Sequence, residues 1–203
     1  MGSILFDNFA RVLYIMYQTN YRGEEMNIWT DMNPERVKPE DFIACIEIQQ
    51  GDKTKYELDK ETGCLIMDRV LYTSTHYPMN YGFIPLTYCG DHDPLDVFVL
   101  CSEPIERLSL VRCYPIGVVV MTDRDERDEK VIAIPFGDPQ YNSYKDISEL
   151  PKHIFDELEH FLRVYKQLEN KKVEVKQLGN RKKAVEIIKD SLKMYQAEFI
   201  NKK

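Results

Sequence analysis

The sequence predicts an α+β protein that is mainly β: a closed or nearly closed antiparallel β-barrel with two flanking C-terminal helices. Short runs of β-branched and aromatic residues alternate with turns rich in Gly, Pro, Asp and Asn up to about residue 140, which is typical of small barrels. The apolar residues then adopt a helical period. The chain contains no GxGxxG motif, no P-loop and no alternating βαβ rhythm, so a Rossmann-type fold is not expected.

The first 25 residues do not resemble the rest of the chain. Asp7, Asn8 and Arg11 interrupt their apolar stretches. No basic segment precedes those stretches and no small-residue cleavage site follows them, so we do not expect a signal peptide. We expect residues 1–25 to be a non-matching extension, either a short helix or a translated leader if the natural start is Met26. Residues 26–203 are expected to form a single domain.

The expected strands follow one another with short turns between them, the first two turns falling at Gly51 and Gly63. We expect strands over Phe42–Ile48, Lys55–Leu58, Cys64–Leu71, Tyr81–Pro85, Asp96–Cys101, Val111–Met121 and Lys130–Phe136.

Two amphipathic helices are expected after the strands. Pro151 suits the first turn of a helix, and apolar residues recur at helical spacing from Ile154 to Leu168. A second apolar stripe runs from Ala184 to Phe199. Because each helix carries one apolar stripe, we expect both to cover the barrel.

Composition excludes several classes of protein. The net charge of −7 argues against general nucleic-acid binding, which needs a basic face. No apolar run approaches the roughly 18 residues that a membrane span requires. The five cysteines are scattered and no pair has CxxC spacing. We therefore expect reduced, mostly buried thiols in a cytoplasmic protein and no zinc site.

Three carboxylates dominate the centre of the sequence. Asp91, Asp93 and Asp96 lie within six residues, directly before the apolar run 97–100, so they are expected on a turn held by a buried strand. Pro94 restricts the backbone of that turn. Like charges this close repel one another, and a hard divalent cation such as Mg²⁺ would relieve the repulsion. The alternative is a solvated acidic turn without a ligand.

A second acidic segment links two later strands. It contains Asp123 and Asp128, and Lys130 lies just inside the next strand. A barrel could bring this loop beside the first acidic turn, although it could equally be a solvated hairpin. Two tyrosines, Tyr77 and Tyr81, could donate to phosphate oxygens, or they could simply be core residues.

Together these motifs resemble the soluble, magnesium-dependent inorganic pyrophosphatases of the bacterial type, over roughly residues 42–170. The family signature Asp-x-Asp-Pro-x-Asp, followed by an apolar run, is present at residues 91–97. The resemblance implies a barrel related to the OB-fold and the hydrolysis of inorganic pyrophosphate to two orthophosphates. Supporting motifs are Glu47, Lys55-Tyr56-Glu57, Asp59–Gly63, Asp68-Arg69, Tyr77–Gly82, Asp123, Asp128, Lys130 and Tyr165-Lys166.

The resemblance also implies a role for each site residue. Asp93 would accept the proton of the attacking water, and several Mg²⁺ ions would neutralise the phosphate oxygens and lower the pKa of that water. The implied metal ligands are Asp91, Asp96, Asp123 and Asp128, with Glu47 and Glu57 as accessory acids nearby. The implied contacts to the phosphoryl groups are Lys55, Arg69, Tyr81, Lys130, Tyr165 and Lys166.

One residue departs from the family pattern, and other functions stay open. His92 stands where the family commonly has a small residue; it could point to solvent, add a softer ligand or tune the metal-bound water. The protein could instead be a metal-dependent hydrolase of another phosphoanhydride, or a non-catalytic OB-type binding module. Its expected partners are pyrophosphate and phosphate, with no nucleic acid and no membrane. The resemblance suggests a homo-oligomer, with a hexamer favoured and His160 at subunit contacts.

Overall fold

The computed structural model describes residues 27–123, 126–169, 171 and 173–201, so the expectation for residues 1–25 lies outside it. Its long helices are α2 (Lys152–Val164) and α3 (Arg181–Tyr195), followed by the π-helical turn η4 (Gln196–Ile200). Short 3-10 turns form η1 (Pro34–Arg36), η2 (Ile147–Glu149) and η3 (Gln167–Glu169). The strands are β1 (Val37–Lys38), β2 (Asp41–Ile48), β3 (Thr54–Leu58), β4 (Leu65–Val70), β5 (Asn80–Phe83), β6 (Asp96–Val99), β7 (Leu110–Asp123), β8 (Glu126–Pro135) and β9 (Val173–Asn180).

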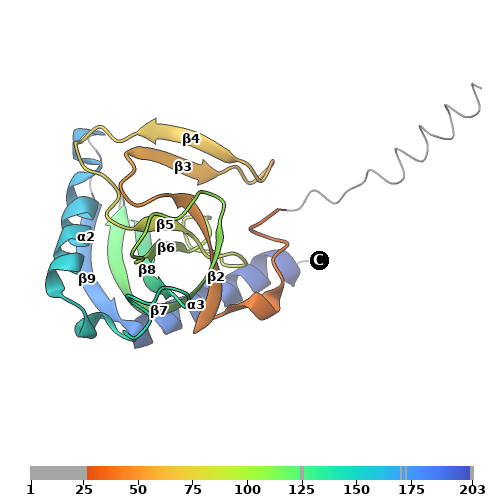
Figure 1. Ribbon diagram of the computed structural model, residues 1–203. Coiled ribbons are helices and arrows are strands. Elements are labelled where there is room, and N and C mark those ends of the chain that lie inside the picture. Colours follow the sequence, from red (N-terminus) through yellow and green to blue (C-terminus); the bar gives the residue numbers. More distant parts are fainter. Residues whose placement is uncertain (1–26, 124–125, 170, 172, 202–203) are drawn as a thin grey trace, which may run out of the picture.

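Seven strands form one sheet in the order β1-β2-β5-β6-β8-β7-β9, and β2 also pairs with β7. The pairings therefore lead from β2 through β5, β6, β8 and β7 back to β2, around the centre of the molecule (Figure 1). One pair differs from the prediction, because β6 and β8 are parallel. Parallel strands need a long connection, and the segment between them supplies it with β7, which runs back antiparallel to β8.

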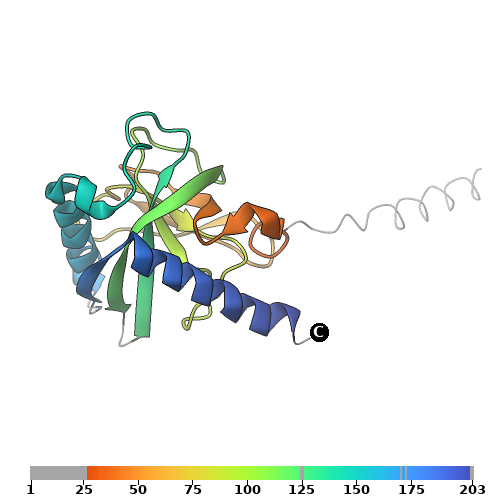
Figure 2. The ribbon, with the colours of Figure 1, turned by 90° about the horizontal axis from the view of Figure 1, so that it is seen from below.

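Both faces of the central strands are buried. Val97 and Val99 of β6 belong to one apolar cluster, whereas Phe98 belongs to a second. The α3 helix packs against the first cluster and runs along the outside of the strands (Figure 2), whereas α2 packs against the second. The unbroken apolar run that marked this strand in the sequence is thus explained by burial on two sides.

The β3–β4 hairpin forms a separate two-stranded sheet and lies above the main sheet in Figure 1. Its strands pair from Thr54 with Val70 to Leu58 with Leu65. The turn between them uses Gly63 at φ +68°, a left-handed conformation that glycine adopts without a steric penalty. Within the part of the chain that the structure describes, the hairpin pairs with no strand of the main sheet.

Several features differ from the expectations. The β9 strand was not predicted; it forms because the long β7 strand offers a second edge for pairing. The first helix ends at Val164, and Leu168 is exposed beyond it. All five cysteines are free, as expected; Cys45 and Cys113 are buried and Cys89 packs against the same core cluster, whereas Cys64 is exposed. None of the described helices is both long and apolar enough to cross a bilayer.

Candidate active site

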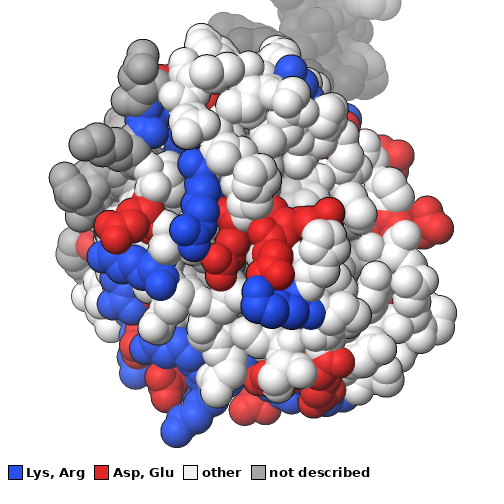
Figure 3. Space-filling model, turned by 90° about the vertical axis from the view of Figure 1, so that its left-hand side faces the viewer, with Lys and Arg blue, Asp and Glu red and all other residues white. Residues whose placement is uncertain are grey.

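A cavity of about 490 Å³ opens between the β3–β4 hairpin, the turn before β6 and the end of α2. Acidic and basic side chains lie beside one another on the face of the molecule that carries α2 (Figure 3). The structure brings most of the predicted site residues to this cavity. Those that line it are Glu47, Lys55, Glu57, Tyr81, Asp91, Asp93, Asp96, Asp128, Lys130, Tyr165 and Lys166.

The acidic turn is built by local hydrogen bonds. The backbone N–H of Asp93 donates to Asp91 Oδ1 at 3.2 Å, and the N–H of Cys89 donates to the carbonyl of Asp93 at 2.9 Å. Below the turn, the N–H of Leu95 donates to the hydroxyl of buried Thr87 at 2.8 Å. These bonds hold the carboxylates at the entry to β6, as the sequence predicted.

His92 occupies a left-handed position in this turn, with φ +68°, a conformation that is uncommon for residues other than glycine. Its side chain is exposed, and its Nδ1 lies 2.6 Å from the hydroxyl of Tyr88. The Tyr88 ring in turn contacts Trp29 and Phe199, with ring centroids 6.4 Å and 5.3 Å away. His92 thus connects the acidic turn to an aromatic cluster.

Lys130 is the central cation of the cavity. It faces Asp96 because parallel pairing places the two residues opposite each other on β6 and β8. Its Nζ lies 2.5 Å from Asp96 Oδ2, 2.9 Å from Asp128 Oδ1 and 3.3 Å from the hydroxyl of Tyr81. Burial alone would lower the pKa of Lys130, but Asp128 and Asp96 hold it well above its ordinary value. The amine is therefore charged at neutral pH.

Two acids of the cavity have pKa values above their ordinary range. Burial, then the charge of Asp96, raises the pKa of Glu47 to about 8. Its Oε1 accepts a hydrogen bond from the N–H of Leu58 at 2.7 Å. Burial and the charges of Asp96, Asp93 and Asp128 likewise raise the pKa of Asp91 to about 6. Added positive charge would lower both pKa values.

The donor set fits a hard divalent cation by its chemistry, because every candidate ligand is a carboxylate. In the described part of the chain, however, no three acidic, histidine or cysteine side chains are grouped closely enough to hold one metal ion. Asp96 and Asp128 both form ion pairs with Lys130. Asp123 ends β7 and pairs through its backbone with Glu126; its side chain lies outside the described part, so its role as a ligand stays a prediction.

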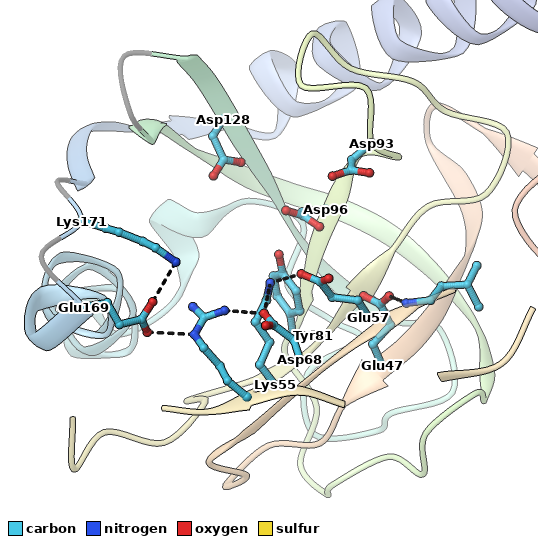
Figure 4. A network of polar contacts seen from close by, with 12 residues as sticks. Glu47, Lys55, Glu57, Asp68, Tyr81, Asp93, Asp96, Asp128, Glu169 and Lys171 are labelled. Atoms are coloured by element: carbon cyan, nitrogen blue, oxygen red, sulfur yellow. Dashed lines mark hydrogen bonds and ion pairs between the residues drawn. The ribbon is translucent and has the colours of Figure 1, made fainter. Parts of the chain in front are cut away.

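The β3–β4 hairpin supplies the next two cations. Lys55 and Arg69 are direct cross-strand partners. Lys55 forms an ion pair with Glu57 and lies 3.2 Å from Asp68 Oδ2. Arg69 does not line the cavity; its guanidinium lies between Asp68 and Glu169 (Figure 4). Among the predicted contacts to the phosphoryl groups, that of Arg69 therefore has the least direct support from this arrangement.

The aromatic wall of the cavity comes from β5 and α2. Tyr81 and Tyr165 are both buried, as the apolar stripe predicted for Tyr165. Burial raises the pKa of the Tyr81 phenol well above its ordinary value, so it remains a hydrogen-bond donor. Lys166 Nζ lies 5.2 Å from the centre of the Tyr165 ring. His160 on α2 is exposed.

Two residues that contact the site were assigned no role from the sequence. Lys60 forms an ion pair with Asp93 and lies 5.2 Å over the ring of Trp29. Glu169 accepts a hydrogen bond from Arg69, which lies 100 residues earlier in the sequence. Neither the lysine nor the glutamate belongs to an apolar pattern or a cluster of like residues, so only the folded arrangement reveals them.

Comparison with known proteins agrees with this arrangement. A family model described as inorganic pyrophosphatase matches residues 44–196. Soluble inorganic pyrophosphatase 2 of Chlamydomonas reinhardtii is 46% identical over 184 residues, which are 90% of this chain and 95% of that protein.

Solved structures give the same result. The inorganic pyrophosphatase of Thermus thermophilus matches with a TM-score of 0.80 at 33% identity, covering 84% of this chain and 99% of that one. The enzyme of Helicobacter pylori matches with a TM-score of 0.76 at 42% identity, covering 79% of this chain and 96% of that one. The family model covers β3 to β9 and both long helices, and the chain belongs to the family of soluble inorganic pyrophosphatases.

Proposed function

We propose that this protein hydrolyses inorganic pyrophosphate to two orthophosphates by in-line attack of water. The observation that carries the proposal is the single cavity in which the acidic turn of Asp91, Asp93 and Asp96 faces Lys55 and Lys130. Such a cavity can neutralise a small, highly charged anion while keeping an acidic group beside it. Phosphoryl transfer depends mostly on positioning and charge stabilisation, so no nucleophilic side chain is required.

The acids of the cavity are suited to several Mg²⁺ ions. Asp91, Asp96 and Asp128, together with Asp123, would hold them, with Glu47 and Glu57 as accessory acids. Mg²⁺, when bound, neutralises phosphate oxygens and makes a coordinated water more acidic. Replacing Asp96 by Ala should raise the Mg²⁺ concentration needed for half-maximal activity, and an unchanged Mg²⁺ requirement would count against this ligand assignment.

The remaining residues of the site would act either in proton transfer or in binding the anion. The Asp93 side chain is 57% exposed, so it can accept a proton from a water molecule at the cavity. Lys130 and the phenol of Tyr81 lie together deeper in the cavity, where they would hold one phosphoryl group. Lys55 and Lys166 would hold the second, together with Tyr165 and Arg69. The lysines act as point charges, whereas an arginine can bind two oxygens at once.

One assay separates the candidate functions. Phosphate release is measured from pyrophosphate, ATP and polyphosphate, each with and without Mg²⁺. We expect rapid release from pyrophosphate with Mg²⁺ only. Release from ATP or polyphosphate at an equal or higher rate would favour a hydrolase of other phosphoanhydrides. Oligonucleotide binding at low salt, without any phosphate release, would favour a binding module.

We further infer a closed, OB-type barrel, because the pairings of the main sheet return to β2. Residues 26–203 would act as one domain of a cytoplasmic homo-oligomer, with a hexamer favoured. Exposed His160 on α2 would lie at a subunit contact, where protonation in mild acid should weaken assembly. Sedimentation equilibrium at pH 5.5 and 8 tests this, and an assembly insensitive to both pH and His160→Gln would contradict it.

A further inference from the structure

Glu169 is a buried carboxylate outside the set of residues discussed for pyrophosphate hydrolysis. It ends η3, shortly after α2, and only 5% of its side chain is exposed. Its Oε1 accepts a hydrogen bond from Arg69 Nε at 2.9 Å, and its Oε2 lies 3.0 Å from Lys171 Nζ. In Figure 4 the carboxylate lies between the labelled Lys171 and the guanidinium group. A carboxylate so enclosed is stable only while it remains paired.

The pair belongs to a chain of alternating charges. Arg69 Nη1 donates to Asp68 Oδ2 on its second side, and the same oxygen lies 3.2 Å from Lys55 Nζ. Two cations proposed to bind phosphoryl groups are therefore connected by Asp68 and anchored to the helical side of the cavity by Glu169. In order, the chain is Glu57, Lys55, Asp68, Arg69, Glu169 and Lys171.

This chain fixes how the guanidinium can point. The group is planar and its donors have a rigid geometry, so holding Nε and Nη1 also fixes the direction of Nη2. Arg69 Nη2 is buried and has no hydrogen-bond partner among the residues that the structure describes. A buried donor is costly when unpaired and binds an acceptor oxygen strongly. Lys55 lies directly across the hairpin and lines the cavity, so an anion bound by Lys55 would lie beside the strand that carries Arg69.

We propose that Glu169 is a positioning residue for substrate binding, which orients Arg69 so that one edge of its guanidinium is kept for a phosphoryl group. The inference rests on the proposed function, in which Arg69 binds substrate. A purely structural ion pair that ties the hairpin to α2 would use the same contacts. The two roles differ in what Glu169→Gln changes: a positioning residue changes KM and orthophosphate binding through Arg69, whereas a purely structural pair changes stability and leaves both unaltered.

The test is a double-mutant cycle over Glu169→Gln and Arg69→Ala. Glutamine keeps the size of the side chain and removes its charge. We expect Glu169→Gln to raise KM for pyrophosphate about tenfold with kcat changed by about twofold or less, since a charge-assisted contact to the bound anion is weakened. The dissociation constant of orthophosphate, measured by calorimetry, should rise by a similar factor. In the Arg69→Ala background, Glu169→Gln should change neither quantity.

The control is Glu174→Gln, which removes an exposed carboxylate from β9 and should leave KM and orthophosphate binding unchanged. Equal effects of Glu169→Gln with and without Arg69 would overturn the proposal, as would a loss of kcat at constant KM. Circular dichroism checks folding. Should Glu169→Gln not fold, the same cycle with Glu169→Asp, whose shorter side chain cannot reach Nε in the same way, gives the same expected and overturning results.

The two proposals fail in different ways. A parent protein that binds orthophosphate but releases none from pyrophosphate would contradict the proposed function. The dissociation constants of orthophosphate, measured over the same double-mutant cycle, would still decide whether Glu169 acts through Arg69.

Discussion

The two sides of the cavity are held by different kinds of interaction. On one side, Asp96 and Lys130 belong to β6 and β8, two adjacent strands buried on both faces. On the other side, Lys55 and Arg69 belong to the β3–β4 hairpin, a separate small sheet that contacts its surroundings through the Leu58 N–H bond to Glu47 and the Arg69–Glu169 ion pair. Asp96 and Lys130 are thus fixed by the core, whereas Lys55 and Arg69, two of the cations proposed to hold substrate, lie on a separate sheet.

The ion pairs on the two sides also differ in exposure. The side chains of Lys130 and Asp128 are 5% and 14% exposed, whereas Glu57, which pairs with Lys55, is 51% exposed. Removing one partner of a buried pair leaves an uncompensated charge, but solvent screens the same change at the surface. The comparison therefore predicts unequal effects of matched substitutions.

The largest effect should come from Asp93→Asn on the acidic side. Turnover should fall by roughly 10²–10⁴-fold, the usual contribution of a general base. Because Asp93 is more than half exposed, stability should change by about 1 kcal/mol or less. Steady-state kinetics and urea unfolding measure the two quantities, and unchanged turnover would refute the role of Asp93 as the base.

A matched pair of lysine substitutions tests the comparison itself. Lys130→Met should lower the free energy of unfolding by about 3–5 kcal/mol, because Asp96 and Asp128 lose their shared partner inside the protein. Lys55→Met, on the hairpin, should lower it by only about 1 kcal/mol or less while raising KM for pyrophosphate. Urea unfolding measures the free energy of unfolding of both variants. Equal losses of stability would contradict the proposed difference between the core strands and the hairpin.

The pH dependence of stability should be altered by Glu47→Gln. Burial raises the pKa of Glu47 to about 8 from an ordinary 4.5, so between these values the folded protein keeps a proton that the unfolded chain releases. This group therefore makes stability fall as pH rises through that window, by up to about 1.4 kcal/mol per pH unit.

The measurement compares unfolding of the parent and Glu47→Gln from pH 5 to pH 8 in a chelator-containing buffer. The variant should gain stability relative to the parent as pH rises. A constant difference across the range would show that Glu47 does not keep its proton in the folded protein.

The smallest effect is expected for Lys60→Met, at the mouth of the cavity. Its contacts with Asp93 are largely exposed, with side-chain exposures of 44% and 57%, so stability should change by about 1 kcal/mol or less. Lys60 also lies over Trp29, the only tryptophan of the chain. The emission of Trp29 should shift in the variant, and an unchanged spectrum would contradict this contact in solution.

Several parts of the fold follow from local patterns. The run 97–100 was predicted as a buried strand, and β6 is buried on both faces. The stripe that placed Tyr165 against the core was also right, because a helical period specifies which face is covered. The β9 strand was missed, since its alternation is short and polar and it depends on the free edge of β7.

The order of the residues is enough to show which acids, lysines and tyrosines are available and on which predicted elements most of them lie, because burial imposes a period that can be recognised along the chain. Which of these side chains meet depends on the folded arrangement. The parallel register of β6 and β8 places Lys130 beside Asp96, and the hairpin brings Arg69 to Glu169. Contacts between residues that are distant in sequence depend on how elements pack, and no local pattern encodes that packing.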